Sequence, residues 1–247
     1  MTAPFSLVLL DADDTLWENE VYFRAAEARL GEILEAWADR DEVAERLLAT
    51  ERNNIPLYGF GAKAFVLSML ETALEVSDHH IGQAAVTEII SLGKSILSQP
   101  VEFLEDVELV VHELAQRWPI VVVTKGDLIH QEAKIMQSGL AHLFQSIEIV
   151  AEKDTATFTR ICNRHGVASD DIVMVGNSVR SDIIPVLNLG GFAVHVPYEH
   201  AWAFEIADLP QHPRLREARG FADVPAILAE LSAIGGQKPR RSDRARR

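Results

Sequence analysis

The chain has 247 residues, of which 48% are hydrophobic and 24% are charged, and its formal net charge is −14 at pH 7. This composition is typical of a water-soluble protein, and the acidic balance argues against a nucleic-acid partner. The longest apolar runs are strand-sized, far below the roughly 20 residues of a membrane span, and no signal-peptide pattern precedes the first of them. A single cysteine, Cys162, excludes an internal disulfide and fits a reducing compartment. We therefore expect a cytoplasmic protein without a membrane partner.

Three carboxylates follow the first apolar run. Residues 7–10 are Leu-Val-Leu-Leu, the continuous apolar pattern of a strand buried on both faces. Asp11, Asp13 and Asp14 come directly after it, and like charges this close are costly unless a cation lies among them. Because parallel α/β sheets place their chemistry at the carboxyl ends of strands, the sequence predicts a hard-metal site here.

The next part of the chain predicts helices only. Residues 53–61 contain two Asn, one Pro and two Gly, so we expect a break between the second and the third helix. A fourth helix is expected to begin near Ser77 or Asp78. The insertion therefore has four helices and no strand, with apolar residues at helical spacing in residues 23–37, 41–52, 65–70 and 77–96.

Strands and helices alternate after residue 100, which predicts a parallel sheet with helices on both faces. We expect a three-layer, Rossmann-like α/β core, and a basic, disordered tail over residues 237–247. The predicted strands cover residues 119–124, 146–150, 171–175, 192–196 and 215–218. The predicted helices cover residues 105–117, 128–138, 155–165, 182–189 and 223–234.

Polar residues follow four of the predicted strands, and these strand ends meet at one edge of a parallel sheet. The first end carries the acidic stretch and the second carries Thr124, followed by Lys125. The third carries Lys153, and the fourth carries a Gly-Asn pair, Gly176 and Asn177, with an acid further on. Any one of these signals is weak, but their order and spacing together predict one composite site.

These four segments resemble the motifs of the haloacid dehalogenase (HAD) superfamily. The resemblance rests on Asp-Ala-Asp-Asp-Thr-Leu from Asp11, on Thr124, on Lys153 and on Gly-Asn-(x4)-Asp ending at Asp182. The helical insertion is similar to the first type of helical cap in that superfamily. The resemblance implies a catalytic core over residues 1–16 and 100–236, a cap over residues 17–99, and Mg²⁺-dependent hydrolysis of a phosphate ester.

The resemblance also implies a role for each catalytic residue. Asp11 is expected to attack phosphorus and form an aspartyl-phosphate, a covalent strategy open to carboxylates. Asp13 is expected to protonate the leaving oxygen and then to deprotonate the hydrolytic water. Thr124 offers donors to the phosphoryl oxygens, and Lys153 places a fixed positive charge between the phosphate and Asp11.

The metal site that the resemblance implies contains one departure from the family pattern. The Asp11 carboxylate and the Asp13 backbone carbonyl are two expected oxygen ligands for Mg²⁺. The third position holds Asn177, whose amide oxygen can ligate but adds no charge. Asp182 either ligates, directly or through water, or holds Lys153. We expect Mg²⁺ to bind, more weakly than with an acid at residue 177.

The cap is expected to choose the substrate, a small phosphorylated metabolite. Tyr58 or Phe60, and Trp17, are candidate contacts to the leaving group, and the alternative is that such aromatics pack a local core. Lys125 is a candidate for additional positive charge near the phosphate. We expect a monomer or a homodimer and no nucleic-acid partner.

Two other functional interpretations remain open. Asn177 also fits metal-independent chemistry of the 2-haloacid dehalogenase type, although the acid Asp13 favours a phosphatase because an alkoxide leaving group needs a proton and a halide does not. A non-enzymatic, phospho-accepting or binding protein is the third possibility, since response-regulator receivers also gather acids, Thr and Lys at parallel strand ends.

Overall fold

The computed structural model of the protein describes residues 5–235. The core is a sheet of six parallel strands in the order β3-β2-β1-β4-β5-β6, so the first strand lies in its interior. The predicted α/β class and the alternation of strands and helices are confirmed. The strands are β1 (Leu7–Leu10), β2 (Ile120–Lys125), β3 (Ser146–Val150), β4 (Ile172–Gly176), β5 (Phe192–His195) and β6 (Leu215–Glu217).

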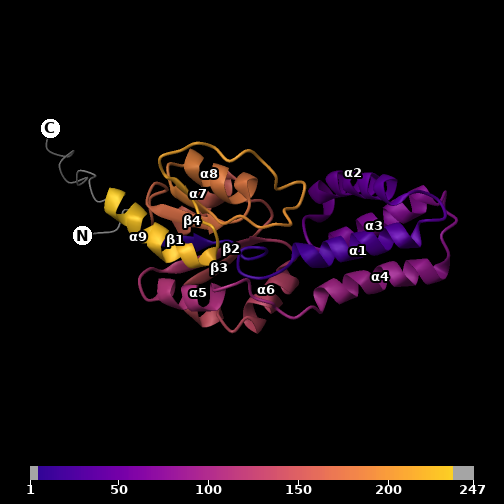
Figure 1. Cartoon of the computed structure of the whole chain (residues 1–247), viewed down its shortest axis with the longest axis horizontal. Helices are drawn as coiled ribbons and strands as arrows, with labels where there is room; N and C mark the ends of the chain where they lie inside the picture. Colours follow the sequence, from indigo (N-terminus) through magenta and orange to yellow (C-terminus); the bar gives the residue numbers. More distant parts are fainter. Residues whose placement is uncertain (1–4, 236–247) are drawn as a thin grey trace.

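Helices cover both faces of this sheet, as Figure 1 shows. Side chains alternate along β1, so Val8 and Leu10 pack on one face while Leu7 and Leu9 pack on the other. The first face is covered by α5 (Val107–Ala115), α6 (Leu128–Gln137) and α9 (Val224–Gly235), and the second by α7 (Thr155–His165) and α8 (Ile184–Asn188). All of β1 is buried, which explains its unbroken apolar sequence.

A separate bundle of four helices extends from the strand-end edge of the core (Figure 1). It consists of α1 (Glu20–Ile33), α2 (Arg40–Tyr58), α3 (Ala62–Val76) and α4 (Gln83–Leu97). The bundle has its own apolar core, in which Leu30, Leu47, Met69 and Ile89 are fully buried or nearly so. We refer to these helices as the cap, and the four-helix insertion predicted from the sequence is present.

The predicted break after the second helix is wrong in its extent. Helix α2 continues through Pro56 to Tyr58, and only residues 59–61 interrupt the helices. Pro56 has no N–H to donate to the Arg52 carbonyl, so the helix loses one hydrogen bond there and ends two residues later. Asn54 also fixes this last part of α2, since its side-chain amide donates to Ser68 Oγ at 3.1 Å.

Two other helix starts differ from the prediction. Helix α4 begins at Gln83 because the backbone of Asp78 and His79 has positive φ values of 49° and 60°, which a helix does not allow. Before α8, residues Val179–Ile183 form a π-helical turn. None of the helices within residues 5–235 combines the length and the apolar character that a bilayer span requires. The predicted basic tail, residues 237–247, lies outside the described residues.

Candidate active site

The carboxyl end of β1 leads into a tight turn that fixes the three acids of the first motif. Asp11 is 5% exposed, and its backbone N–H donates to the Val175 carbonyl of β4 at 2.9 Å. Asp13 pairs with Trp17 across an isolated bridge. Asp14 takes the positive φ of 60° that closes the turn, and its carboxylate accepts the backbone N–H of Glu20 at 2.9 Å at the start of α1. The three neighbouring acids therefore have different local roles.

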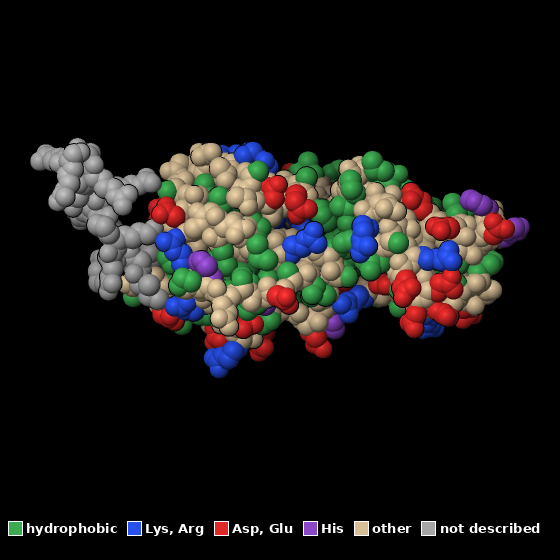
Figure 2. All heavy atoms as spheres, turned by 90° about the horizontal axis from the view of Figure 1, so that it is seen from above, with side chains coloured by type: hydrophobic (Ala, Val, Ile, Leu, Met, Phe, Trp, Pro, Cys, Tyr) green, Lys and Arg blue, Asp and Glu red, His purple; other side chains and the backbone are tan. Residues whose placement is uncertain are grey.

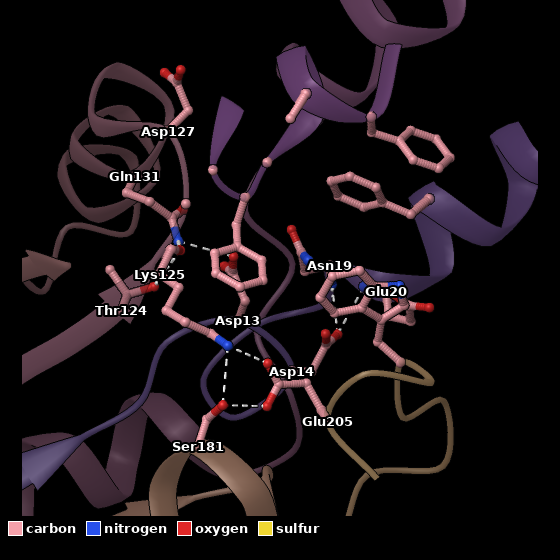
Figure 3. Close-up of a pocket in the computed structure, with 18 of the residues that line it drawn as sticks. Asp13, Asp14, Asn19, Glu20, Thr124, Lys125, Asp127, Gln131, Ser181 and Glu205 are labelled. Atoms are coloured by element: carbon pink, nitrogen blue, oxygen red, sulfur yellow. Dashed lines mark hydrogen bonds and ion pairs between the residues drawn. The ribbon is translucent and has the colours of Figure 1, made fainter. Parts of the chain in front are cut away.

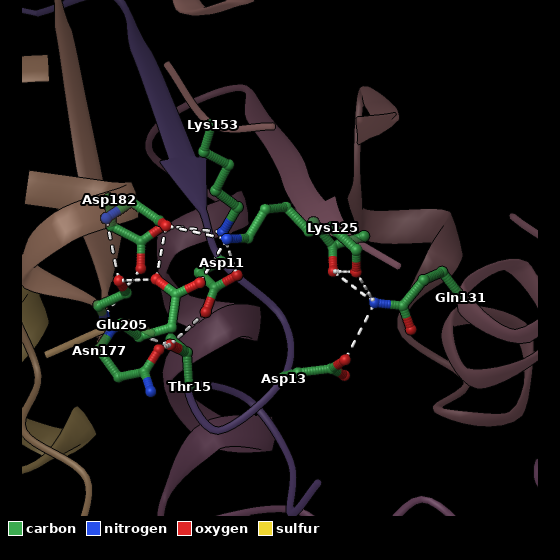
Figure 4. A network of polar contacts seen from close by, with 12 residues as sticks. Asp11, Asp13, Thr15, Lys125, Gln131, Lys153, Asn177, Asp182 and Glu205 are labelled. Atoms are coloured by element: carbon green, nitrogen blue, oxygen red, sulfur yellow. Dashed lines mark hydrogen bonds and ion pairs between the residues drawn. The ribbon is translucent and has the colours of Figure 1, made fainter. Parts of the chain in front are cut away.

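Lys153 joins two of the buried carboxylates (Figure 4). Its Nζ donates to Asp11 Oδ1, and to Asp182 Oδ1 at 2.7 Å. Burial alone would lower the pKa of Lys153, but the charges of Asp11 and Asp182 raise it above its ordinary value. The lysine is therefore a permanent cation at the floor of the site.

The turn after β4 brings the fourth predicted motif beside Asp11. The Thr15 hydroxyl lies 2.9 Å from Asp11 Oδ2 and 3.2 Å from Asn177 Oδ1. Asp182 Oδ2 accepts the backbone N–H of Ser178 at 3.0 Å. A side chain at Gly176 would lie 2.3 Å from the Asp182 carboxylate, so only glycine fits there. The Gly-Asn-(x4)-Asp spacing thus has a steric basis.

The donor set suits a magnesium ion in its chemistry. Asp11 Oδ2 and Asn177 Oδ1 are hard oxygens that lie within hydrogen-bond distance of the same hydroxyl, and they are therefore close to each other. Both oxygens of Asp182 already accept hydrogen bonds, which fits a residue that holds Lys153. Within residues 5–235 no group of three or more His, Cys, Asp or Glu side chains has the arrangement of a metal site. Beside Asp11, the side-chain oxygen that the fourth motif offers to a metal is the Asn177 amide oxygen.

Three side chains bind the carboxylate of Asp13. Trp17 Nε1 donates to Oδ1 at 2.8 Å, Lys134 Nζ donates to Oδ1 at 2.5 Å, and Gln131 Nε2 donates to Oδ2 at 3.0 Å. Burial would raise the pKa of Asp13, but Lys134 and these hydrogen bonds hold it below its ordinary value. The same Gln131 amide nitrogen lies 2.6 Å from Thr124 Oγ1. Thr124 and Asp13 are thus linked through one side chain of α6.

A loop after β5 forms one wall of the site, and the sequence did not predict this contribution. Glu205 accepts hydrogen bonds from Ser178 Oγ, Ser181 Oγ and Lys125 Nζ. Burial alone would raise the pKa of Glu205, but Lys125 and the hydroxyls keep it below its usual value. Lys125 Nζ also lies 4.2 Å from the centroid of the Phe60 ring in the cap. Figure 3 shows this cluster at the wall of the pocket.

These residues line one cavity of about 160 Å³ between the core and the cap. Asp11, Thr124, Lys125, Lys153 and the fourth-motif residues all line it. The four strand ends that the sequence predicts to meet therefore contribute residues to the same cavity. Its other lining residues come from α6, among them Gln131 and Lys134, and from the cap and the loop after β5, among them Glu20, Phe60 and Trp202.

Two predicted substrate contacts do not reach the cavity. Trp17 is fully buried and packs near Phe103, with a centroid distance of 6.5 Å. Its role is to hold Asp13, so its prediction as a substrate contact is wrong. Tyr58 is 49% exposed and is not among the lining residues, whereas its neighbour Phe60 is. The end of α2 turns Tyr58 outward because the helix continues to that residue.

Four residues of the site were not predicted from the sequence: Gln131, Lys134, Ser181 and Glu205. Gln131 and Lys134 are three residues apart on α6, which places them on one helix face, and α6 directly follows the second motif. A polar pair at this spacing after Thr124 was a usable signal. Glu205 lies in a loop without a motif, and only the tertiary structure places it.

Comparison with known proteins agrees with this geometry. A family model described as haloacid dehalogenase-like hydrolase matches residues 5–190. A crystal structure of a haloacid dehalogenase-like family hydrolase from Xanthomonas campestris is 39% identical, covers 96% of both chains and has a TM-score of 0.88. The structure of a 2-haloacid dehalogenase from Pseudomonas syringae pv. Tomato DC3000 is 23% identical with a TM-score of 0.60, over 92% of this chain and 99% of that one, and shares the fold.

One curated relative is a phosphatase. N-acylneuraminate-9-phosphatase from Homo sapiens is 31% identical over 108 residues, which cover 42% of this chain and 44% of that enzyme. The aligned part is thus less than half of either protein. The family model matches residues 5–190, the architecture is shared, and the site lies at the strand ends. The chain therefore belongs to the haloacid dehalogenase-like hydrolases.

Proposed function

We propose that the protein is a Mg²⁺-dependent phosphatase that hydrolyses a small phosphorylated metabolite through an aspartyl-phosphate on Asp11. The observation that carries the proposal is the pairing of Asp11, held by the buried cation Lys153, with a second acid two residues later that faces the same cavity. The phosphatase relative supports the same reaction class.

In the first step, an Asp11 carboxylate oxygen attacks phosphorus, and the bond from phosphorus to the ester oxygen breaks. Asp13 donates a proton to that oxygen, which leaves as an alcohol. The Lys153 ammonium and the Thr124 hydroxyl offer positive charge and a hydrogen bond to the phosphoryl oxygens. Lys134 and the hydrogen bonds hold the pKa of Asp13 below its ordinary value. The negative charge of an arriving phosphate shifts that pKa upward, toward the protonated acid that this step uses.

In the second step, Asp13 accepts a proton from water as the water oxygen attacks phosphorus. The bond between phosphorus and the Asp11 oxygen breaks, and inorganic phosphate leaves with Asp11 restored. Mg²⁺, when bound by Asp11, the Asp13 carbonyl and Asn177, supplies charge stabilisation for the phosphoryl oxygens. Asp182 keeps Lys153 in place through the contact at 2.7 Å.

The test is a screen of phosphorylated metabolites and p-nitrophenyl phosphate, with Mg²⁺ and with EDTA. We expect release of inorganic phosphate that EDTA abolishes. Asp11→Asn is the blank: it removes the nucleophile and should abolish turnover while circular dichroism and the melting temperature show a folded protein. Full turnover by Asp11→Asn would remove this residue from the mechanism.

A second candidate function is metal-independent dehalogenation, which is favoured by one observation, the neutral amide of Asn177 next to the nucleophile. Chloride release from a 2-haloacid in the presence of EDTA, without phosphatase activity, would establish it in place of the phosphatase. A phospho-accepting protein would instead take up one phosphoryl group per chain and show no multiple turnover.

A further inference from the structure

One carboxylate of the cavity comes from the loop after β5 and lies among donors of the core. The hydroxyls of Ser178 and Ser181 both donate to Glu205 Oε2, and Lys125 Nζ donates to Glu205 Oε1. Lys125 Nζ also donates to Ser181 Oγ at 3.0 Å, and Figure 3 shows Lys125, Ser181 and Glu205 joined in this way. Two hydroxyls and an ammonium around one carboxylate are the donor set of an anion-binding pocket.

The three donors belong to the fixed part of the site. Each directly precedes or follows a motif residue of the core, namely Thr124, Asn177 or Asp182. Ser178 and Ser181 are 6% and 3% exposed, and the Ser181 backbone N–H donates to Ser178 Oγ at 2.9 Å. The positions of the two hydroxyls are thus set by the turn after β4, independently of Glu205.

Glu205 itself lies in a segment with few anchors. The loop after β5, residues 196–214, contains no helix or strand, and irregular loops of more than about 15 residues are uncommon in compact domains unless they are functional or disordered. Trp202 packs against the cap, and Leu209 packs against a small apolar cluster of the core. Between these two anchors, no residue of the segment 203–208 is buried. A segment with so little buried surface moves at a small cost in free energy.

Two arginines lie beside the segment 203–208. Arg180 Nη1 donates to the Phe204 carbonyl at 3.2 Å, and the Arg52 guanidinium lies 5.6 Å from the centroid of the Phe204 ring. Figure 2 looks onto this side of the molecule and shows Lys and Arg side chains where the core meets the cap. Positive charge beside a pocket favours the approach of anions.

The charge of Lys125 is already matched in this structure. The sequence predicts that Lys125 adds positive charge near the phosphate, but Glu205 now takes that charge, and Glu152 Oε1 lies 3.5 Å from the same Nζ with its side chain 53% exposed. A second anion beside Glu205 would be repelled by it. An anion that replaced Glu205 would meet the same ammonium and the same two hydroxyls. The pocket therefore suits one anion at a time.

We infer that Lys125, Ser178 and Ser181 form a subsite for an anionic oxygen group of the substrate, and that Glu205 fills this subsite until that group displaces it. This inference rests on the proposed phosphatase activity. The exchange replaces one anion by another, so the lysine stays paired and the two hydroxyls keep an acceptor. The segment 203–208 moves out with Glu205, while the anchors on either side stay in place. The group is either a carboxylate on the alcohol part of the substrate or the phosphoryl group itself.

Cleavage by chymotrypsin after Phe204 tests the displacement, because this bond lies within the segment that moves. The full chain with Mg²⁺ is given inorganic phosphate, glycerate, or glycerol as the uncharged match of glycerate. We expect at least one of the two anions to accelerate this cleavage, measured by the masses of the fragments, and glycerol to leave it unchanged. Acceleration by phosphate identifies the phosphoryl group, and acceleration by glycerate identifies a carboxylate. Unchanged or slower cleavage with both anions would overturn the inference.

Glu205→Ala tests the subsite by emptying it. The Kd of the anion that accelerates cleavage, measured by calorimetry, should fall by roughly tenfold because the ligand no longer competes with a charge-assisted hydrogen bond. Adding Lys125→Met should abolish that gain. Glu205→Gln, which keeps the size of the side chain, should shift the Kd in the same direction, and the melting temperature reports the folding of each variant.

Glu199→Ala is the matched control for these variants. Glu199 is an exposed acid of the same loop that does not line the cavity, so its replacement removes the same charge without emptying the subsite, and we expect the parental Kd. A Kd that rises or stays unchanged in Glu205→Ala would show that Glu205 is a permanent support of Lys125, and the inference would be wrong.

These measurements separate the inference from the phosphatase proposal, because neither depends on turnover. If no ester, including p-nitrophenyl phosphate, is hydrolysed but an anion still accelerates cleavage after Phe204, the phosphatase proposal fails while the anion subsite stands. If p-nitrophenyl phosphate is hydrolysed but neither anion changes that cleavage, the subsite is wrong and the phosphatase stands.

Discussion

Three side chains hold the carboxylate of Asp13 in one orientation. Three donors on two different segments, the turn after β1 and helix α6, fix its carboxylate, and the closest of them carries a positive charge. A proton-transferring group gains from such fixation because its geometry toward the leaving oxygen is set before substrate arrives. Lys134 is thus a positioning residue that acts through Asp13.

We predict that Lys134→Met lowers kcat for alkyl phosphates by on the order of tenfold, and much less for p-nitrophenyl phosphate, whose leaving group needs little protonation. Lys134 lowers the pKa of Asp13, so its removal raises that pKa. The acidic limb of the pH profile, where Asp13 must be ionised to accept a proton from water, then moves to higher pH. Steady-state rates against pH, with the exposed Lys94→Met on α4 as control, measure both effects. Equal losses for both leaving groups would contradict the positioning role.

Some residues of the site can be predicted from the sequence, and others cannot. Asp11, Lys153 and Asn177 follow strands, and Thr124 lies near the end of β2. The ends of neighbouring parallel strands meet by topology, so a linear pattern predicts that these residues meet. Glu205 reaches the same place from an irregular loop by hydrogen bonds to Ser178 and Ser181. No local sequence pattern encodes those contacts, so they could not be predicted.

At the scale of elements, the packing of α3 against α4 depends on one small residue. Gly93 on α4 faces Val66 on α3 so closely that an added Cβ would lie 1.9 Å from Val66 Cγ2. With an alanine at residue 93, either Val66 must change rotamer or the two helices must move apart. The helical period of the apolar residues predicted the cap helices, but it carries no information about this distance of approach.

We predict that Gly93→Ala destabilises the protein by roughly 1–3 kcal/mol, the usual cost of overpacking. The double variant Gly93→Ala with Val66→Ala should recover most of that loss, because the second change removes the atoms that clash. Urea denaturation of the two single variants and the double variant measures the coupling. Additive effects in the double variant would argue against direct contact as the cause.

Helix α2 illustrates how tertiary contacts override a local signal. Two Asn and a Pro near its end predict a break, yet the helix persists to Tyr58 because Asn54 is tied to α3 and Pro56 lies in the last turn. The actual interruption is confined to residues 59–61, where Gly59 and Gly61 have φ values of 74° and 113°. This short connection presents Phe60 to the cavity.

At the scale of the whole molecule, the loop after β5 connects the cap to the core. Trp202 meets Phe60 edge to face at a centroid distance of 5.8 Å, and Arg52 lies 5.6 Å from the centroid of Phe204. The same loop supplies Glu205 to the site. Cap position and site geometry are therefore linked through one segment of chain.

We predict that Trp202→Ala raises KM by roughly threefold to tenfold with a smaller change in kcat, since an aromatic pair contributes about 0.5–1.5 kcal/mol beyond its buried area. The reason is that the cap loses a contact that holds it over the cavity. Steady-state kinetics measure the change, and limited proteolysis near residues 59–61 reports the loosened cap. Trp37→Ala, at a 43% exposed position of the cap, is the control. A KM equal to that of the parent would show that this contact does not hold the cap.

The single cysteine of the chain has a practical consequence for studying that linkage. Cys162 is 2% exposed in the layer between the sheet and α7, and burial raises the pKa of its thiol, so maleimide dyes will react with it slowly. Cysteines introduced at Leu57 on α2 and Leu109 on α5, which are 74% and 73% exposed, offer reactive thiols on the cap and the core. A donor and an acceptor fluorophore at these two positions would report the separation of cap and core in single molecules, with the native thiol left in place.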